Sequence, residues 1–351
     1  MTPLDDATAL QRVLMACLQA LADGDHHSAR HLADRALGLA ATSGPPARAN
    51  ALLLDGMVEQ AGGDTDAAAG RYAAAAELAE EHLAEPEGIQ LFLHAKRELA
   101  ALHRGQGRYR QAEQILQDAL AALATSRAAE PASEDLAMFH NEFGMVCKYS
   151  GNFDQAAVSY ETALTLVEAM EPVNESDLAD IHHNLGGLAH ARGDYAAAEG
   201  PARRAVAIRE RALGPSHPEA AADRAALAPI LLGLGHLEEA EALLEDALAV
   251  FGQAYGTAHV DYVIALGNLA AVTHRLGRHQ TAEALYRQTL RAMEESLGPG
   301  HPDLVAVLAN LADLNRTLGN SGEAHSLEMR ARAILAAAVR PDHPDLGILN
   351  T

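Results

Sequence analysis

Apolar residues recur along the chain with the three-to-four-residue spacing of amphipathic helices, and glycines interrupt this pattern at regular intervals. Sustained alternation of Val, Ile, Thr and Tyr, which would predict strands, is nearly absent. The spacings between successive glycines are 39, 44, 44 and then four times 42 residues. Each glycine is expected to end one helix (helix A) before a second (helix B) begins, which predicts eight helical repeats. These turn glycines are Gly24, Gly63, Gly107, Gly151, Gly193, Gly235, Gly277 and Gly319.

Two columns of small residues keep a fixed distance from the turn glycines. The fifth residue after each glycine is always alanine, and the twelfth is alanine in every repeat except one, where it is Thr289. We expect both columns to lie where helix B presses against helix A, because a bulky side chain there would separate the pair at a cost of about 1–3 kcal/mol. The columns are Ala29, Ala68, Ala112, Ala156, Ala198, Ala240, Ala282 and Ala324, and then Ala36, Ala75, Ala119, Ala163, Ala205, Ala247, Thr289 and Ala331.

The connections between the later repeats carry a second pattern, LGPSHPE at 213–219, YGTAHVD at 255–261, LGPGHPD at 297–303 and RPDHPD at 340–345. Proline suits the first helical position because its missing N–H would be unpaired there, and the following acid is favoured by the helix dipole. We therefore expect the histidines of these segments to have loop or helix-capping roles. They are His217, His259, His301 and His343.

The composition favours one all-helical array over the two or three domains that 351 residues would otherwise suggest. Aromatic residues make up only 4% and tryptophan is absent, so the apolar part is mostly Ala and Leu, which favour closely packed helices. Two cysteines, Cys17 and Cys147, are too few for a disulfide framework and lack metal-ligand spacing. We expect both to be small core residues.

The net charge of −22, from 26 basic and 48 acidic residues, argues against nucleic acid as a partner. Only Lys96 and Lys148 are lysine, which we attribute to a GC-rich genome and take to favour a bacterial source. The first residues lack the positive charge of a secretory signal, and no apolar run is long enough to span a membrane. The sequence thus predicts a cytoplasmic protein without a membrane partner, and it contains no phosphate-binding loop or dinucleotide fingerprint that would require a cofactor.

These features resemble the tetratricopeptide repeat in the 42-residue form of kinesin light chains and many bacterial relatives. The resemblance rests on NLG or NLA at 184–186, 268–270 and 310–312, EAE at 239–241, AE at 282–283, and the HPD or HPE connections. It covers about residues 8 to 340 and implies an all-α, right-handed solenoid superhelix of about eight repeats. We expect a flexible N-terminus at 1–8, the repeat array at 9–338, and a tail or partial ninth repeat at 339–351.

The resemblance also implies that helix A lines a concave groove that holds an extended peptide. Asn184, Asn268 and Asn310 share one register, nine residues before the turn glycine, where related proteins hold a peptide backbone. An asparagine side chain offers both donors and an acceptor to any peptide unit, whatever its sequence. The full set of expected groove residues is Arg97, Arg104, Asn141, Lys148, Asp180, His183, Asn184, His190, Asn268, His274, Arg275, Asn310, Asp313 and Arg316.

Histidines and acids concentrate in repeats four and five, around His140, Asp180, His182, His183 and His190. Because His183 and His190 are seven residues apart, about 10 Å along a helix, they cannot both reach one zinc ion at about 2.1 Å. Asp180 and His183 could share a metal only with a further ligand such as His140 from the neighbouring repeat. We expect a polar groove wall here, with a metal site, acid–base chemistry and incidental surface histidines as alternatives.

Repeats five and six break the pattern of the array. Pro201 falls inside helix B of repeat five and Pro229 inside helix A of repeat six, where proline removes a backbone hydrogen bond at about 3 kcal/mol. Repeat six also lacks the groove asparagine. We expect an apolar patch that suits a hydrophobic side chain of a ligand. Its residues are Ala225, Ala226, Pro229 and Leu232.

Three functions remain open from the sequence. The first is a non-enzymatic scaffold that holds a peptide or protein tail. The second is a peptide-responsive regulator without a DNA-binding domain of its own, and the third is a tailoring enzyme with a His/Asp site around repeats four and five. No nucleophile–base pair supports the third, so we lean against an enzyme. The apolar residues of the tail, Leu346, Ile348 and Leu349, could cap the array or mediate self-association.

Overall fold

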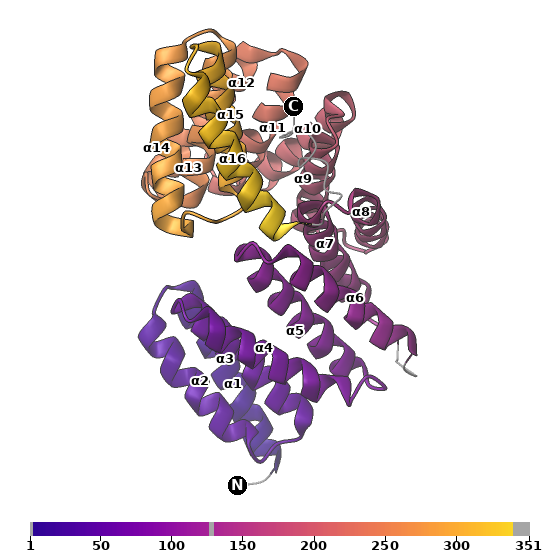
Figure 1. The fold of residues 1–351 in the computed structure, drawn as a ribbon. Helices are drawn as coiled ribbons and strands as arrows, with labels where there is room; N and C mark the ends of the chain where they lie inside the picture. Colours follow the sequence, from indigo (N-terminus) through magenta and orange to yellow (C-terminus); the bar gives the residue numbers. More distant parts are fainter. Residues whose placement is uncertain (1–2, 126–129, 340–351) are drawn as a thin grey trace. The chain divides into compact units, whose positions relative to one another are not determined.

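The computed structural model describes residues 3–125 and 130–339, with side chains from residue 8 onward, and every regular element in these ranges is a helix (Figure 1). The helices are α1 (Pro3–Ala22), α2 (His26–Ala40), α3 (Pro45–Ala61), α4 (Thr65–Glu80), α5 (Pro86–Gly105), α6 (Tyr109–Thr125), α7 (Ser133–Ser150), α8 (Phe153–Glu168), α9 (Glu175–Ala191), α10 (Tyr195–Leu213), α11 (Pro218–Leu234), α12 (Leu237–Ala254), α13 (Val260–Arg275), α14 (His279–Leu297), α15 (Leu304–Thr317) and α16 (Ser321–Ala338). Odd-numbered helices are the predicted A helices and even-numbered ones the B helices. The predicted all-α repeat fold is confirmed.

The eight turn glycines end the A helices as expected. All have positive φ angles, between 70° and 87°, which only glycine adopts without strain. The residue after the glycine donates its backbone N–H to a carbonyl five residues earlier; Asp194 donates to Ala189 at 3.0 Å and His236 to Leu231 at 2.9 Å. This is the hydrogen bond of a Schellman motif, which satisfies carbonyls that the ending helix leaves unpaired.

The residue after the turn glycine also begins the next helix. The side chains of Asp25, Asp64 and Asp194 each accept a hydrogen bond at 3.0 Å from a backbone N–H in the first turn of helix B. In these three repeats a glycine and one aspartate end helix A and start helix B, which explains why the connection within the repeat is so short.

The two predicted columns of small residues lie at the contact between helices A and B. All sixteen residues are buried, with no more than 3% of their surface exposed. A third small column lies on helix A, seven residues before the turn glycine. There Gly56 and Gly144 face the rings of Tyr72 and Tyr160, and a Cβ atom on either glycine would lie 2.5 Å from a ring carbon. Glycine is required at these positions because a buried tyrosine fills the space.

The expectations about the two cysteines and about three of the four connection histidines are confirmed. Cys17, which belongs to the third column, and Cys147 are both fully buried and are not joined in a disulfide. The histidines of the connections cap helices: Nδ1 of His217, His259 and His301 accepts a backbone N–H two residues later at 3.2 to 3.3 Å. His343 lies outside the described residues.

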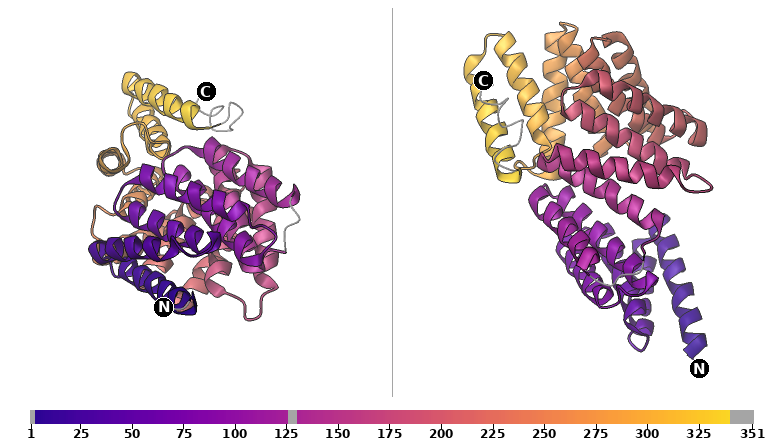
Figure 2. Two further views of the ribbon diagram at one scale, coloured as in Figure 1. Left: turned by 90° about the horizontal axis from the view of Figure 1, so that it is seen from below. Right: turned by 90° about the vertical axis from the view of Figure 1, so that its right-hand side faces the viewer.

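The helices form two compact units, residues 1–105 with 111–143, and residues 106–110 with 144–351. In the second unit the hairpins α9–α10, α11–α12, α13–α14 and α15–α16 each pack against the next, as Figures 1 and 2 show. The A helices α9, α11, α13 and α15 also contact one another in that order. They form a continuous layer, as do α1, α3 and α5 in the first unit.

The ends of the chain add three observations. α1 begins at Pro3, within the segment expected to be a flexible N-terminus. The tail expected to cap the array or to self-associate lies, from residue 340 on, outside the described residues. No helix among the described residues combines the length and apolar character needed to cross a bilayer.

The contact between Gly144 and the ring of Tyr160 provides a test of the packing within a repeat. We expect Gly144→Ala to lower the free energy of unfolding by about 1–3 kcal/mol, because the new methyl group would overlap the buried ring of Tyr160. Chemical denaturation followed by circular dichroism measures the change.

The matched control is Gly70→Ala in the middle of α4, where a Cβ would meet no atom within 4 Å. Because alanine favours helix over glycine, this variant should be more stable by about 0.5–1 kcal/mol. Equal effects of the two substitutions would contradict the packing described here.

Candidate functional site

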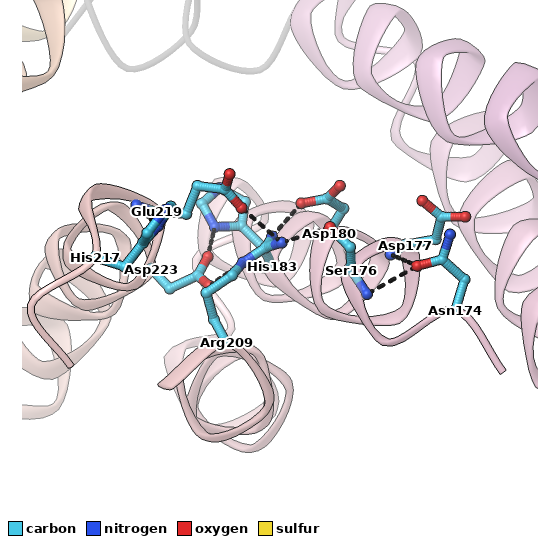
Figure 3. Close-up of polar contacts among 9 residues, drawn as sticks. All are labelled: Asn174, Ser176, Asp177, Asp180, His183, Arg209, His217, Glu219 and Asp223. Atoms are coloured by element: carbon cyan, nitrogen blue, oxygen red, sulfur yellow. Dashed lines mark hydrogen bonds and ion pairs between the residues drawn. The ribbon is translucent and has the colours of Figure 1, made fainter. Parts of the chain in front are cut away.

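A buried arginine organises a cluster of charged side chains on the A layer of the second unit. Arg209, on α10, is only 5% exposed. Its guanidinium group contacts the carboxylates of Asp180 on α9 and of Glu219 and Asp223 on α11, with distances of 3.0 Å to Glu219 and 3.3 Å to Asp223. It also donates to the hydroxyl of Ser176 at 2.9 Å. Figure 3 shows these groups converging on Arg209 from the neighbouring helices, so one cation joins two consecutive repeats.

Asp223 also fixes the orientation of His183. The Asp223 carboxylate is 4% exposed and lies 2.8 Å from Nδ1 of His183, while its other oxygen contacts Arg209. A carboxylate at this distance favours the proton on Nδ1, which leaves Nε2 of the neutral ring as an acceptor. Ser176, the hydroxyl of this cluster, is bound by Arg209 rather than by His183.

Burial and charge act together on the titration of this cluster. Burial alone would lower the pKa of Arg209, but the carboxylates of Asp180 and Asp223 outweigh it and raise that pKa. Loss of solvent raises the pKa of Asp180, the nearby carboxylate of Asp223 adds to the effect, and Arg209 opposes it. The guanidinium group thus stays charged, and the cluster has more acidic than basic groups.

Neither Arg209 nor Asp223 belongs to the groove positions expected from the resemblance, but the repeats contain a signal for both. Arg209 lies sixteen residues after its turn glycine, where every other repeat has an apolar residue: Ala40, Ala79, Leu123, Val167, Phe251, Met293 and Leu335. Asp223 lies twelve residues before its glycine, where the others have Arg12, Ala51, Ala95, Phe139, Ile181, Ala265 and Val307. Two columns that are almost entirely apolar thus change together, and the structure pairs the two exceptions.

The second feature of the A layer is a hollow of about 300 Å³ in repeats seven and eight. It is lined by Tyr149, Ile264, Gly267, Asn268, Thr289, Met293, Asp303, Ala306, Val307 and Asn310. Tyr149 belongs to α7, three repeats before Ile264 and four before Asn310. Since these residues line one hollow, the A layer of this unit curves inward, which is the concave side expected for helix A.

Two of the three predicted groove asparagines line this hollow. Asn310 is exposed, and Asn268 is half-buried and donates to the backbone carbonyl of Ala225 at 3.4 Å. That contact leaves the Asn268 carbonyl oxygen as an acceptor. Asn184 differs, because only 7% of its surface is exposed and little of it remains for a ligand. The structure thus brings Asn268 and Asn310 together and leaves Asn184 inside the layer.

The predicted groove cations of repeat three are paired with acids of the first unit. Arg104 contacts both oxygens of Glu142 on α7, at 2.8 and 3.2 Å. Arg97 contacts Glu98, and Arg97 together with His94 lowers the pKa of that carboxyl to about 2 although burial alone would raise it. Asn141 is half-buried beside Glu142 in α7.

The other predicted groove residues of the second unit are divided between partly buried and exposed positions. Lys148 lies 4.9 Å above the ring of Tyr149, and His190 packs edge-on against Tyr195. Burial lowers the pKa of both His190 and His274. Arg275 and Asp313 are exposed, and Arg316 pairs with Asp313 and Glu328.

The predicted apolar patch lies on α11 and is partly covered. Ala225 is buried, while Ala226, Pro229 and Leu232 are half-buried, and Leu232 packs against the core of repeats five to seven. Both Pro201 and Pro229 lie within continuous helices, as predicted. The role of the apolar patch in ligand binding stays a prediction.

Two of the three metal candidates have other contacts, whereas Nδ1 of the third, His140, is buried without a hydrogen-bond partner among the described residues. Asp180 binds Arg209, and His183 binds Asp223. Among the described residues, no group of three or more His, Cys, Asp or Glu side chains is arranged to hold a metal ion.

His182 is buried, with only 7% of its surface exposed, and neither of its ring nitrogens has a hydrogen-bond partner among the described residues. Burial, with a smaller effect of Arg204, lowers its pKa, whereas Glu168 opposes the shift.

The paired exceptions Arg209 and Asp223 allow a double-mutant test. Arg209→Met leaves the buried carboxylate of Asp223 without its cation, so we expect a loss of about 3–5 kcal/mol in the free energy of unfolding. Adding Asp223→Ala inserts the residues that repeat seven has at both positions, Met293 and Ala265, and should restore most of that loss. Urea denaturation of the wild type, the single variant and the double variant measures the free energy of unfolding. A double variant that is no more stable than Arg209→Met would contradict the proposed dependence of each charge on the other.

His182 predicts a pH dependence whose sign follows from its lowered pKa. The unfolded chain takes up a proton near the usual pKa of 6.5, whereas the folded chain resists it, so stability is lost as the pH falls below 6.5. His182→Leu inserts the residue found at the equivalent positions 266 and 308. We expect the variant to lose about 1 kcal/mol less than the wild type between pH 7.5 and 5.5. Parallel stability profiles would contradict the prediction.

The chain matches known proteins in family and in fold. Two profiles described as tetratricopeptide repeat match residues 177–253 and 261–337 and residues 93–123, together just over half of the chain. No curated protein sequence matches.

Three solved structures with similar folds are 13 to 14% identical in sequence to this chain. A Rap protein complexed with Competence and Sporulation Factor has a TM-score of 0.63 at 14% identity and covers 94% of this chain and 99% of its own. The apo form of the quorum sensor NprR from B. thuringiensis has a TM-score of 0.62 at 13% identity and covers 93% and 87%. The apo form of RapI has a TM-score of 0.59 at 14% identity and covers 94% and 87%.

The glycine turns, the small columns and the matched repeats agree with one another. This chain belongs to the tetratricopeptide-repeat superfamily.

Proposed function

We propose that this protein is a scaffold that holds an extended peptide segment against the A layer of its second unit. Repeats of this family form protein- and peptide-binding scaffolds, and this chain has that fold. The observation that carries the proposal is the hollow in repeats seven and eight, which is lined by Asn268 and Asn310 from equivalent positions of adjacent repeats.

The two amides suit the repeating backbone of an extended chain. Each can donate to a peptide carbonyl and accept from a peptide N–H, so binding would not depend on the sequence of the peptide at those points. The contact between Asn268 and the Ala225 carbonyl holds its side chain in one orientation before a ligand arrives, which reduces the entropy lost on binding.

Charge determines which peptides are favoured. The chain has a net charge of −22, and the exposed parts of Asp180 and Glu219 add carboxylates to the same A layer. Opposite charge speeds association and like charge opposes it. We therefore infer a neutral or basic peptide as the ligand rather than an acidic one.

A regulator that responds to a peptide is the second candidate. It is supported by the fold shared with the Rap protein complexed with Competence and Sporulation Factor and with the quorum sensor NprR. In this version the same surface would bind the peptide, and the bound array would then act on another protein.

The asparagines provide the test. A library of fluorescein-labelled nonapeptides made from neutral and basic residues is titrated with the protein, and binding is measured by fluorescence polarisation. We expect saturable binding that weakens about tenfold or more when Asn268 and Asn310 are both changed to Ala, because each lost hydrogen bond is worth about 0.5–1.5 kcal/mol.

Asn320→Ala is the matched control, because Asn320 immediately precedes α16, is exposed and does not line the hollow. This variant should bind like the wild type. No binding of any library pool, or equal binding by the double variant, would overturn the proposed function.

A further inference from the structure

Two neighbouring residues of the hollow depart from the pattern that the other repeats share. Gly267 lies ten residues before its turn glycine, where the other repeats have a side chain: Leu14, Leu53, Arg97, Asn141, His183, Ala225 and Ala309. Thr289 is the one member of its column that is not alanine. The two exceptions belong to the same repeat and face each other across the contact between α13 and α14.

Gly267 and Thr289 depend on each other sterically. A Cβ atom on Gly267 would lie 3.1 Å from the Thr289 methyl carbon and 3.8 Å from its hydroxyl oxygen. The larger threonine therefore fits because residue 267 has no side chain. The absence of a side chain at 267 also leaves that part of the hollow open, since both residues line it.

The hydroxyl of Thr289 is a buried polar group without a partner. Thr289 is 0% exposed, and its hydroxyl oxygen makes no hydrogen bond among the described residues. Leaving such a group unpaired costs about 1–3 kcal/mol, and the seven alanines of this column avoid that cost. This hydroxyl is closed to solvent behind Gly267, so a ligand group in the adjacent hollow can complete its hydrogen bonding only after the threonine side chain turns toward the hollow.

The walls around this hydroxyl suit an aromatic ring. Tyr149 and Ile264 are large apolar side chains that remain 39% and 44% exposed at the rim. Met293 and Val307 are buried behind them. The Tyr149 ring already stacks on Tyr109 with 5.3 Å between the ring centroids, so a ligand ring would meet its edge, and it would also gain from contact with the sulfur of Met293. A hollow of about 300 Å³ accommodates one such side chain but is at the lower limit for a separate small molecule.

We infer that this hollow is a specificity pocket for a tyrosine side chain of the bound peptide. This inference rests on the proposed function, because the pocket selects one residue of a peptide whose backbone Asn268 and Asn310 hold. The ring lies against Tyr149, Ile264 and Met293, and its hydroxyl reaches past Gly267 toward the hydroxyl of Thr289. An acidic side chain is disfavoured, because Asp303 also lines the hollow and like charges repel.

The test compares nonapeptide pools in which one position at a time is fixed as Tyr, Phe, Leu, Ala or Asp. At one position we expect the Tyr pool to bind about tenfold more tightly than the Ala pool and several-fold more tightly than the Phe pool. The Asp pool should bind most weakly. Fluorescence polarisation gives the ratios, and the ratio rather than the affinity is the readout.

Two variants assign the preference to the pocket. Ala306→Trp fills the hollow from an exposed position of α15, so the advantage of Tyr over Ala should disappear while the Ala pool still binds. Thr289→Val keeps the shape of the side chain but removes its hydroxyl, so Tyr and Phe should become equal while both remain ahead of Ala. Ala254→Trp, at an exposed position at the end of α12 and outside the residues that line the hollow, is the control that should keep every ratio.

The outcomes separate this inference from the proposed function. Absence of binding by every pool overturns the proposed function, whereas binding without any preference for an aromatic residue overturns only the pocket. A preference that survives Ala306→Trp places the aromatic residue elsewhere and also overturns the pocket. If Thr289→Val still binds the Tyr pool more tightly than the Phe pool, the Thr289 hydroxyl does not bind the tyrosine hydroxyl, and that part of the inference is wrong.

Discussion

The close contact between helix A and helix B of each repeat is the constraint on which the rest of this structure depends. Sixteen positions at this contact hold fifteen alanines and one threonine, all buried. The contact brings the two helical backbones close together, and the glycine turn that joins them needs a positive φ angle. With the hairpin fixed in this way, the A helices pack beside one another, and their remaining faces form a layer that is available for binding.

Positions that depart from the small residues of this contact therefore need an explanation. Thr289 introduces a hydroxyl where the contact otherwise tolerates only a methyl group, and it fits because its neighbour Gly267 has no side chain. A random substitution at either position alone would leave a clash or a void. The pair together produces a buried polar atom beside a hollow, and this is why we assign that hollow a role in choosing the ligand.

The cluster around Arg209 is a second paired departure, of a different kind. Arg209 and Asp223 replace apolar residues with opposite charges that contact each other and link repeats five and six. A buried ion pair contributes little net stability compared with apolar residues of the same volume. Its presence is better explained by what it positions: Asp223 holds Nδ1 of His183, and Arg209 holds Asp180 and Glu219 at the edge of the A layer.

The sequence by itself determined the helical repeats, the turn glycines, the small columns, the buried cysteines and the capping histidines. These features are local or periodic, and each repeat is in effect another measurement of the same pattern. The sequence's resemblance to a known family also predicted helix A as the binding face, which stays a prediction. It could not distinguish Asn184 from Asn268 and Asn310, because equal register does not fix how deeply neighbouring side chains bury a residue.

The tertiary structure alone decided which residues from different repeats meet. Tyr149 reaches the hollow formed three and four repeats later because the A layer of the second unit curves, and curvature accumulates from small rotations between repeats that no single segment encodes. Arg209 finds Asp180, Glu219 and Asp223 because a long side chain on helix B crosses to two A helices. Both sites thus depend on distances across the fold, whereas the periodic pattern specifies only contacts along it.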